Sequence, residues 1–150
     1  MAHSKNVMHL NRFTDYTLRT LFLTAANPNR LVRLSEIANY YQISIDHLRK
    51  VVHNLSKLGY LETHRGKNGG MKLAQTPDNI NIGQIVAETE GVTPLIDCGS
   101  DCTLTPLCSL TGLLNEAQQA FFDTLNQYTL QDLIADPHML RMLQLPINNH

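Results

Sequence analysis

All three cysteines of this chain lie within eleven residues, at Cys98, Cys102 and Cys108. Their spacing is C-x3-C-x5-C, and an odd, isolated cluster of this kind cannot form a disulfide framework. Three thiols on one short segment are typical of a metal or iron–sulfur centre whose fourth ligand comes from elsewhere. The cysteines alone leave the group open: a 2Fe–2S or a 4Fe–4S cluster, one per subunit, a structural zinc ion and a thiol-redox switch would all suit them.

The charge of the chain is distributed unevenly, although its formal net value is only −1. Residues 1–75 contain eleven Lys and Arg against four Asp and Glu, a net charge of +7. Residues 76–150 contain one base and nine acids, a net charge of −8. A basic half joined to an acidic half indicates nucleic-acid binding by the first half, with chance segregation of solvated charges as the alternative.

The sequence shows no sign of membrane insertion or export. No apolar run is long enough to cross a bilayer, and the N-terminal MAHSKNVMHLNR lacks the apolar region of a signal peptide. We therefore expect a cytoplasmic protein without a membrane partner. A cytoplasmic location keeps thiols reduced and available to a metal.

The basic half predicts three helices, the last two separated by a short turn. They are expected over residues 14–27, from Ser35 to a turn at 42–43, and from Ser44 to about Leu58, with Thr14, Ser35 and Ser44 as N-caps. The third helix has an apolar stripe of Ile45, Leu48, Val52 and Leu55, joined by Val51 and Leu58. Its other face carries polar residues suited to base edges and phosphates: Ser44 at the cap, then Asp46, His47, Arg49, Lys50, His53, Asn54 and Lys57. This pattern predicts a DNA recognition helix, and the alternative is an ordinary amphipathic surface helix.

A hairpin is predicted directly after that helix. Residues 60–64 and 71–73 are expected to form short strands joined by Arg65-Gly66-Lys67-Asn68-Gly69-Gly70, in which Asn-Gly is a strong hairpin signal. A tip carrying Arg65, Lys67 and Asn68 suits insertion into a minor groove or along phosphates, whereas a simple solvated loop is the alternative. Together these elements predict a winged helix-turn-helix DNA-binding domain over residues 8–76, with a double-stranded DNA operator as its partner.

The acidic half, over residues 77–145, predicts a cysteine-bearing loop and helices for dimerisation. A short helix is expected over 81–90, and Thr105-Pro106 opens a long one of about 22 residues, roughly 33 Å. Its apolar positions recur every three or four residues: Leu110, Leu114, Ala117, Phe121, Leu125 and Tyr128. So long a helix is expected to pair with its copy in a homodimer, the alternative being a helix lying across its own domain. Thr129-x-x-Asp132 predicts one more short helix. The predicted fold is therefore mainly α, a winged helix-turn-helix domain with a long C-terminal dimerisation helix.

Several motifs carry a family resemblance that covers roughly residues 8 to 140. They are Arg12-Phe13-Thr14-Asp15-Tyr16 with Leu18-Arg19, the hairpin tip 65–70, Ile82-Gly83, the run 102–108 from Cys102 to Cys108, and Tyr128-Thr129-Leu130-Gln131-Asp132-Leu133. With them the chain resembles the NsrR-type nitric-oxide-sensing repressors, a branch of the winged-helix regulator family that includes the iron–sulfur regulator IscR. IscR-like members place a His three residues after the last cysteine, where this chain has Thr111, which favours the NsrR branch.

The resemblance implies a dimeric repressor whose iron–sulfur cluster is held by Cys98, Cys102 and Cys108 and senses nitric oxide. It also implies that Asp15 of the partner subunit is the fourth ligand. A carboxylate is a hard, weakly held iron ligand beside three soft thiolates, so it leaves a labile position. Arg19, one turn along the same helix, is predicted to pair with Asp15 when the cluster is absent.

Alternatives remain at the fourth ligand and at the level of function. The C-x3-C gap is shorter than the family's, so Asp97 or Asp101 would compete as ligands, and a helix-start carboxylate such as Asp15 also has an ordinary role beside the helix dipole. An iron–sulfur enzyme or cluster carrier is the alternative from another class. The chain shows no Gly-rich phosphate loop, no readable nucleophile–base pair and no C-x3-C-x2-C motif, so we expect no enzyme.

Overall fold

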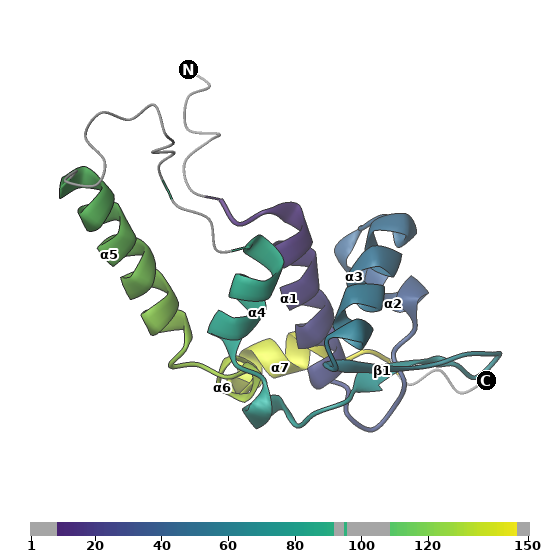
Figure 1. The fold of residues 1–150 in the computed structure, drawn as a ribbon. Helices are drawn as coiled ribbons and strands as arrows, with labels where there is room; N and C mark the ends of the chain where they lie inside the picture. Colours follow the sequence, from purple (N-terminus) through teal and green to yellow (C-terminus); the bar gives the residue numbers. More distant parts are fainter. Residues whose placement is uncertain (1–8, 92–94, 96–108, 147–150) are drawn as a thin grey trace, which may run out of the picture.

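The computed structural model describes residues 9–91, 95 and 109–146. In chain order these form α1 (Arg12–Ala25), α2 (Leu34–Tyr41), α3 (Ile45–Lys57), β1 (Leu61–His64), β2 (Gly70–Leu73), the 3-10 turn η2 (Pro77–Asn79), α4 (Ile82–Glu90), α5 (Ser109–Leu125), α6 (Leu130–Ile134) and α7 (Pro137–Leu143). Helix α1 lies at the centre, with α2, α3 and the hairpin on one side and α4 on the other (Figure 1). The mainly helical fold class and the winged helix-turn-helix are as predicted. No helix among the described residues has the length and apolar character needed to span a membrane.

One apolar core holds these elements together. It is formed by side chains that are almost fully buried, among them Leu21, Leu23, Ile37, Leu48, Leu55, Ile80, Ile85 and Leu130. The core therefore contains residues from both sides of position 76, the predicted boundary between the two halves of the chain. Helix α1 contributes to contacts with α3, α4 and α6, so it joins the basic half to the acidic half.

The beginning of α1 differs from the prediction. Asn11, not Thr14, is the N-cap, and its Oδ1 accepts from the Thr14 backbone N–H at 2.7 Å. Asparagine is among the best N-cap residues, so the helix begins three residues earlier than the threonine suggested. Thr14 is instead completely buried, with its Oγ1 3.0 Å from a carboxylate oxygen of Glu90. This contact joins the start of α1 to the end of α4.

The predicted cap of α2 is also wrong, whereas that of α3 is confirmed. Helix α2 begins at Leu34 after Arg33, whose backbone N–H donates to the Glu36 carboxylate at 2.7 Å, so Ser35 lies inside the helix. Ser44 caps α3 and accepts from the backbone N–H of His47 at 3.5 Å.

The apolar stripe of α3 is shorter than predicted. Leu48, Val51 and Leu55 are buried, but Ile45 and Leu58 are 40% and 39% exposed. The buried stripe therefore runs from Leu48 to Leu55, and the side chains at the two ends of the predicted stripe are exposed to solvent.

The hairpin is antiparallel and is extended by a third segment. Leu61 pairs with Leu73 and His64 with Gly70. Both strands end where predicted, at His64 and Leu73, and each begins one residue away from its predicted start. Val32 adds an isolated bridge to Met71 on the other side of β2, with N···O distances of 2.9 and 2.8 Å. Gly70 has φ +152°, and a Cβ there would lie 2.9 Å from the Val32 carbonyl oxygen. Glycine is thus required where the loop before α2 crosses the base of the β1–β2 hairpin, which is the wing of the fold.

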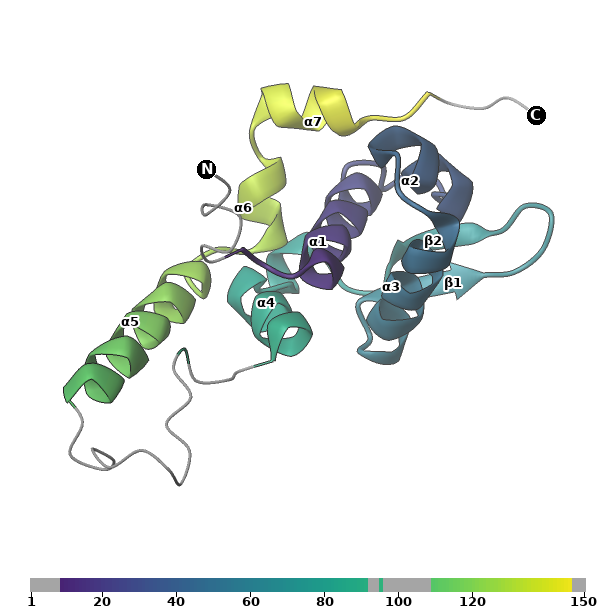
Figure 2. The ribbon, with the colours of Figure 1, turned by 90° about the horizontal axis from the view of Figure 1, so that it is seen from above.

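Helix α5 stands apart from the body of the molecule and lies at the opposite end from the hairpin (Figures 1 and 2). It has 17 described residues, and none of them is buried. The predicted start at Thr105-Pro106, with Cys108 in the first turn, lies outside the described residues. The helix ends at Leu125, before the predicted Tyr128, because the Tyr128 carbonyl accepts from the Ile82 N–H and Thr129 bridges to Asn81. Thr129 caps α6 as predicted, and α7, which follows, was not predicted.

We predict that Gly83→Ala destabilises the fold. A Cβ at Gly83 would lie 1.9 Å from Oδ1 and 2.9 Å from the backbone N of Asn126, where α4 meets the end of α5. Overpacking of this kind costs about 1–3 kcal/mol, which urea unfolding at fixed protein concentration would measure. Gly112→Ala is the matched control: nothing lies within 4 Å of a Cβ there, so it should stabilise α5 by up to about 1 kcal/mol. Equal stability of the two variants would contradict this account of the junction.

Candidate nucleic-acid interface

The polar face of α3 is open to solvent over its whole length. Ser44, Asp46, His47, Arg49, Lys50 and His53 are exposed, and Asn54 is half-buried. Arg49 donates to Asp46 at 3.0 Å, but both side chains are largely exposed, so this ion pair contributes little to stability. The guanidinium therefore remains available to a stronger anion. This face has the composition that readout of a DNA major groove requires.

A groove of about 710 Å³ lies between α3 and the hairpin, and basic side chains line it from three directions. Arg49 and His53 come from α3, Arg65 and Lys67 from the hairpin tip, and Arg33 from the residue before α2. The structure thus brings together four of the residues predicted to bind DNA; Lys50 and Asn68 are exposed but do not line the groove. A concave surface with this charge attracts a phosphate backbone.

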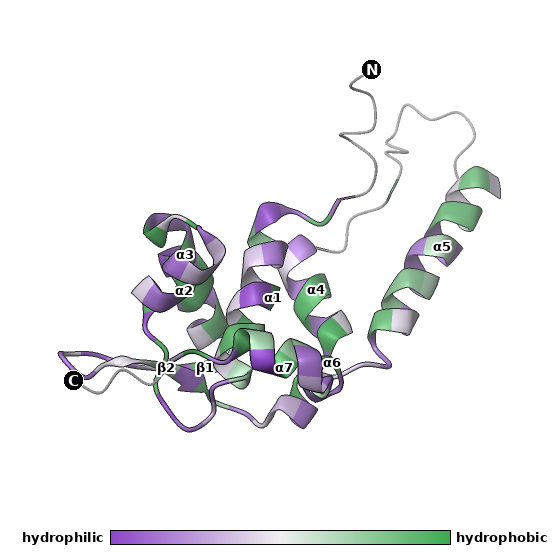
Figure 3. Ribbon diagram, turned by 180° about the vertical axis from the view of Figure 1, so that it is seen from behind, coloured by the Kyte–Doolittle hydropathy of each residue, from purple (hydrophilic) through white to green (hydrophobic). Residues whose placement is uncertain are grey.

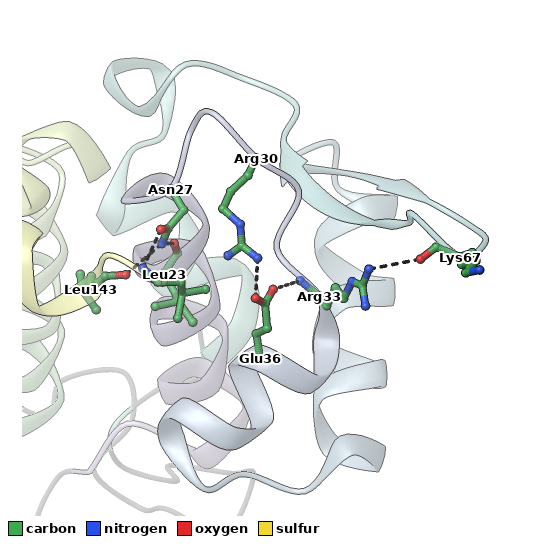
Figure 4. A network of polar contacts seen from close by, with 8 residues as sticks. Leu23, Asn27, Arg30, Arg33, Glu36, Lys67 and Leu143 are labelled. Atoms are coloured by element: carbon green, nitrogen blue, oxygen red, sulfur yellow. Dashed lines mark hydrogen bonds and ion pairs between the residues drawn. The ribbon is translucent and has the colours of Figure 1, made fainter. Parts of the chain in front are cut away.

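Arg33 was missed in the sequence analysis, because it belongs to neither the recognition helix nor the hairpin loop. Its side chain reaches the groove because Val32 is paired with β2, and this pairing joins segments 39 residues apart in the chain. No local motif marks such a contact. Its Nη2 donates to the backbone carbonyl of Lys67 at 3.2 Å (Figure 4).

Asp15 and Arg19 lie on one face of α1, one helical turn apart. Arg19 Nε donates to Asp15 Oδ1 at 2.8 Å, with both side chains 45% exposed. This hydrogen bond raises the pKa of Arg19 above its ordinary value. The same guanidinium lies over the ring of Tyr41, 5.5 Å from its centroid, and burial raises the pKa of that phenol to about 12. Asp15 is thus connected, through Arg19, to the last turn of α2.

Two further contacts surround this pair. Tyr16 lies 6.0 Å, between ring centroids, from His47 at the start of α3. An apolar groove of about 460 Å³ lies beside the pair and extends to α7; it is lined by Asp15, Leu18, Arg19, Phe22, Tyr40, Tyr41, Met139, Met142 and Leu143. The first turns of α1 therefore contact both helices of the helix-turn-helix.

Cys98, Cys102 and Cys108 lie outside the described residues, but the structure places the helix that precedes their segment. The Glu90 carboxylate accepts from the Asn11 backbone N–H at 2.9 Å, and the Thr89 carbonyl accepts from the Asn11 side chain at 3.2 Å. The end of α4 is thus fixed to the beginning of α1, four residues before Asp15. Within the described residues, no group of three His, Cys, Asp or Glu side chains could hold a metal ion.

The donor set fits an iron–sulfur cluster by its chemistry. Three thiolates are the ligands that such clusters take, and one further ligand completes the set. Asp15 is half-exposed in the first turn of α1, so its carboxylate is accessible to a group outside its own helix. The same donors suit zinc, which also accepts thiolate and carboxylate ligands.

Comparison with known proteins assigns the chain to a family. Residues 10–136 match the Rrf2 model, described as an iron-dependent transcriptional regulator. The HTH-type transcriptional regulator NsrR of Bacillus licheniformis is 46% identical over 141 residues, covering 91% of this chain and 99% of that protein. NsrR of Bacillus subtilis is 40% identical over 144 residues, covering 92% and 99%. These similarities confirm the resemblance found in the sequence.

Solved structures show the same fold at lower sequence identity. CymR, the global cysteine regulator of B. subtilis, is similar with a TM-score of 0.67 at 22% identity, covering 86% of this chain and 98% of that one. IscR of T. potens is similar with a TM-score of 0.70 at 22% identity, covering 87% and 88%. The winged helix-turn-helix arrangement is therefore shared with characterised regulators.

We predict that Arg65→Ala weakens DNA binding and lowers its salt dependence. Loss of one phosphate contact reduces the slope of log K against log salt by about 0.9 per subunit. Fluorescence anisotropy would measure this slope on the selected duplex, which is the DNA that the wild-type protein enriches from a random-sequence pool. Arg141→Ala, an exposed cation on α7 outside the groove, is the control and should leave the slope unchanged. A wild-type slope for Arg65→Ala would refute the assignment of the hairpin as a DNA-binding wing.

Proposed function

This chain belongs to the Rrf2 family of transcriptional regulators, and from that premise we propose a cytoplasmic, dimeric, NsrR-type DNA-binding repressor whose operator affinity is set by an iron–sulfur cluster that senses nitric oxide. The observation that carries the DNA-binding part is the basic groove between α3 and the wing. The sensing part is carried by the three cysteines between α4 and α5, in a segment that begins beside the first turn of α1.

The DNA-binding surface has two parts with different tasks. The exposed face of α3, with Lys50 and His53, would meet base edges in the major groove, and Ser44 at its N-terminus would meet a phosphate. The wing, with Arg65, Lys67 and Asn68, would follow the adjacent backbone or minor groove. Because Lys50, Arg65 and Lys67 carry positive charges, affinity would depend strongly on salt.

Dimerisation is supported by the apolar face of α5. Leu110, Leu113 and Phe121 are 48%, 59% and 41% exposed, and no residue of α5 is buried by the part of the chain that the structure describes. Figure 3 shows apolar residues along this helix. Large apolar side chains gathered on one helix face commonly mark an interface with another protein. A second copy of the same helix would bury this face and would fix the distance between two recognition helices.

Four residues would hold the cluster: Cys98, Cys102, Cys108 and Asp15 of the partner subunit. When bound, the cluster would supply iron that reacts with nitric oxide. Asp15 would serve as the ligand that leaves, since a carboxylate binds iron less tightly than thiolates do and this one is half-exposed. Reduced thiols, which the cytoplasm maintains, are required for the other three ligands.

Arg19 would receive Asp15 when the carboxylate leaves the metal. The two side chains are already within hydrogen-bond distance, so the exchange needs no movement of the helix. The Arg19 guanidinium also contacts Tyr41, which lies directly before the turn between α2 and α3. A change in the partner of Asp15 would therefore alter the contacts that position the recognition helix.

The partner-subunit origin of Asp15 can be tested with mixed dimers. We predict that a dimer of one Cys102→Ser subunit and one Asp15→Ala subunit contains one complete site, because the intact cysteines of the second subunit meet the intact Asp15 of the first. Native mass spectrometry of differently tagged, co-expressed subunits purified without oxygen should find one cluster per mixed dimer. The Cys102→Ser homodimer should be folded and should contain none.

The control is a mixed dimer of one Cys102→Ser subunit and one Asp46→Ala subunit, in which Asp46 is an exposed acid on α3. This dimer retains one complete site whichever subunit donates Asp15. A mixed dimer with Asp15→Ala that holds no more cluster than the Asp15→Ala homodimer would show that Asp15 does not act across the dimer. Zinc in the wild-type protein would support the structural-zinc alternative, which leaves the DNA-binding function in place.

We further predict that Arg19→Ala reduces the response to nitric oxide. The ratio of affinities for the selected duplex before and after anaerobic exposure should fall toward one, since the freed Asp15 has lost its alternative partner. Allosteric ratios are typically about 5–150-fold, so the loss should be measurable by anisotropy. Arg12→Ala, an exposed cation at the start of the same helix, should respond as the wild type does. Unchanged switching in Arg19→Ala with full cluster content would rule out the exchange.

A further inference from the structure

One cation in the basic groove belongs to neither the recognition helix nor the wing. Arg33 lies immediately before α2, and its main chain is fixed on both sides. Val32 exchanges two backbone hydrogen bonds with Met71 of β2, at 2.9 and 2.8 Å, and the Arg33 N–H donates to Glu36 at 2.7 Å. Because the backbone is held at these points, the side chain starts from a defined position between α2 and the base of the wing.

The Arg33 side chain reaches the tip of the wing. Its Nη2 donates to the carbonyl oxygen of Lys67 at 3.2 Å, in the loop between β1 and β2 (Figure 4). A guanidinium has five N–H donors arranged as a planar fork, so this bond leaves several donors for another acceptor. The residue lines the same groove as Arg49 and Arg65.

The charge of Arg33 is not neutralised by its nearest acid. Glu36 accepts from the guanidinium of Arg30 and from the backbone of Arg33, so the carboxylate serves Arg30 as its ion-pair partner (Figure 4). In the part of the chain that the structure describes, no carboxylate lies within ion-pair distance of the Arg33 guanidinium. An exposed positive charge, fixed in a basic groove and free of an internal counterion, is poised for an external anion.

We infer that Arg33 is a third element of the DNA interface, which binds a phosphate of the strand lying in the groove while it holds the wing at Lys67. This inference rests on the proposed DNA-binding function. Because one guanidinium contacts both the DNA phosphate and the Lys67 carbonyl, the orientation of the wing depends on the phosphate. The wing therefore takes its position when the DNA backbone is bound. A lysine supplies the same charge without the planar fork, and it would preserve only the phosphate contact.

The experiment compares Arg33→Ala and Arg33→Lys with the wild type on the selected duplex. Arg33→Ala should bind at least about tenfold more weakly, as expected for the loss of a charged hydrogen bond, and its salt slope should fall by about 0.9 per subunit. Arg33→Lys should keep the wild-type slope. It should lose the part of the DNA's protection from hydroxyl-radical cleavage that the wing contributes. Arg65→Ala is the positive control for that protection, and Arg141→Ala is the control for a cation outside the groove.

Each other result overturns a defined part of the inference. A wild-type slope for Arg33→Ala would refute the phosphate contact, and full wing protection in Arg33→Lys would refute the wing contact. Both failures leave the proposed function intact, because the wild-type protein still binds the selected duplex. If the wild-type protein enriches no duplex at all, the proposed function fails, and the inference fails with it.

Discussion

The Glu90 carboxylate, which joins the last turn of α4 to the first turn of α1, determines where the remaining functional parts lie. It accepts from the Asn11 N–H at 2.9 Å and contacts the buried hydroxyl of Thr14 at 3.0 Å. Its negative charge sits at the N-terminus of α1, where the helix dipole favours it. Because of this junction the cysteine segment starts beside the turn that carries Asp15. The same helix continues into the core and contacts α3, so the region of the proposed sensor and the region of the proposed DNA interface share one rigid element.

A second set of polar contacts ties the C-terminal helix to the wing. Asn27 is buried, and its amide donates to the Leu143 carbonyl at 2.9 Å (Figure 4). Its carbonyl accepts from the Leu145 N–H at 2.8 Å. Three residues on, Arg30 pairs with Glu36, with both side chains at most 22% exposed. Removal of Arg30 or Glu36 would leave a poorly solvated charge, so this pair is costly to break. The loop between α1 and α2 is thus held at two points, by Asn27 and by Arg30. That loop leads into Val32 and Arg33, so one segment contacts α7 at its beginning and the base of the hairpin at its end.

What the sequence predicted well depends on local signals. Ser44 caps α3, and the predicted hairpin forms with a turn over Gly66–Gly69, in which the Gly69 N–H donates to the Gly66 carbonyl, because capping and turn preferences act within a few residues. The errors lie where another nearby residue is the better cap, or where a contact distant in sequence determines the end of a helix. Asn11 replaced Thr14 as a cap, and α5 ends early because the strand-like segment at Asn81 pairs with Thr129. Arg33 gains its place from a β-bridge that no local pattern reveals. The candidate ligands came from residue type and spacing together with the family resemblance, and in the proposed site their assembly would depend on a second subunit.

The energetics of the Asp15–Arg19 pair limit what it does in the proposed switch. Both side chains are 45% exposed, and ion pairs of this kind contribute only about 0–1 kcal/mol. Allosteric coupling usually amounts to about 1–3 kcal/mol, so formation of the pair does not by itself supply the free energy of switching. That free energy would come from the loss of the bond between Asp15 and the metal, which also releases a constraint across the dimer. In the proposed switch the pair would instead give the freed carboxylate a defined destination, next to Tyr41 and the turn that leads into α3. Arg19 would then direct the change, and the loss of the metal ligand would drive it.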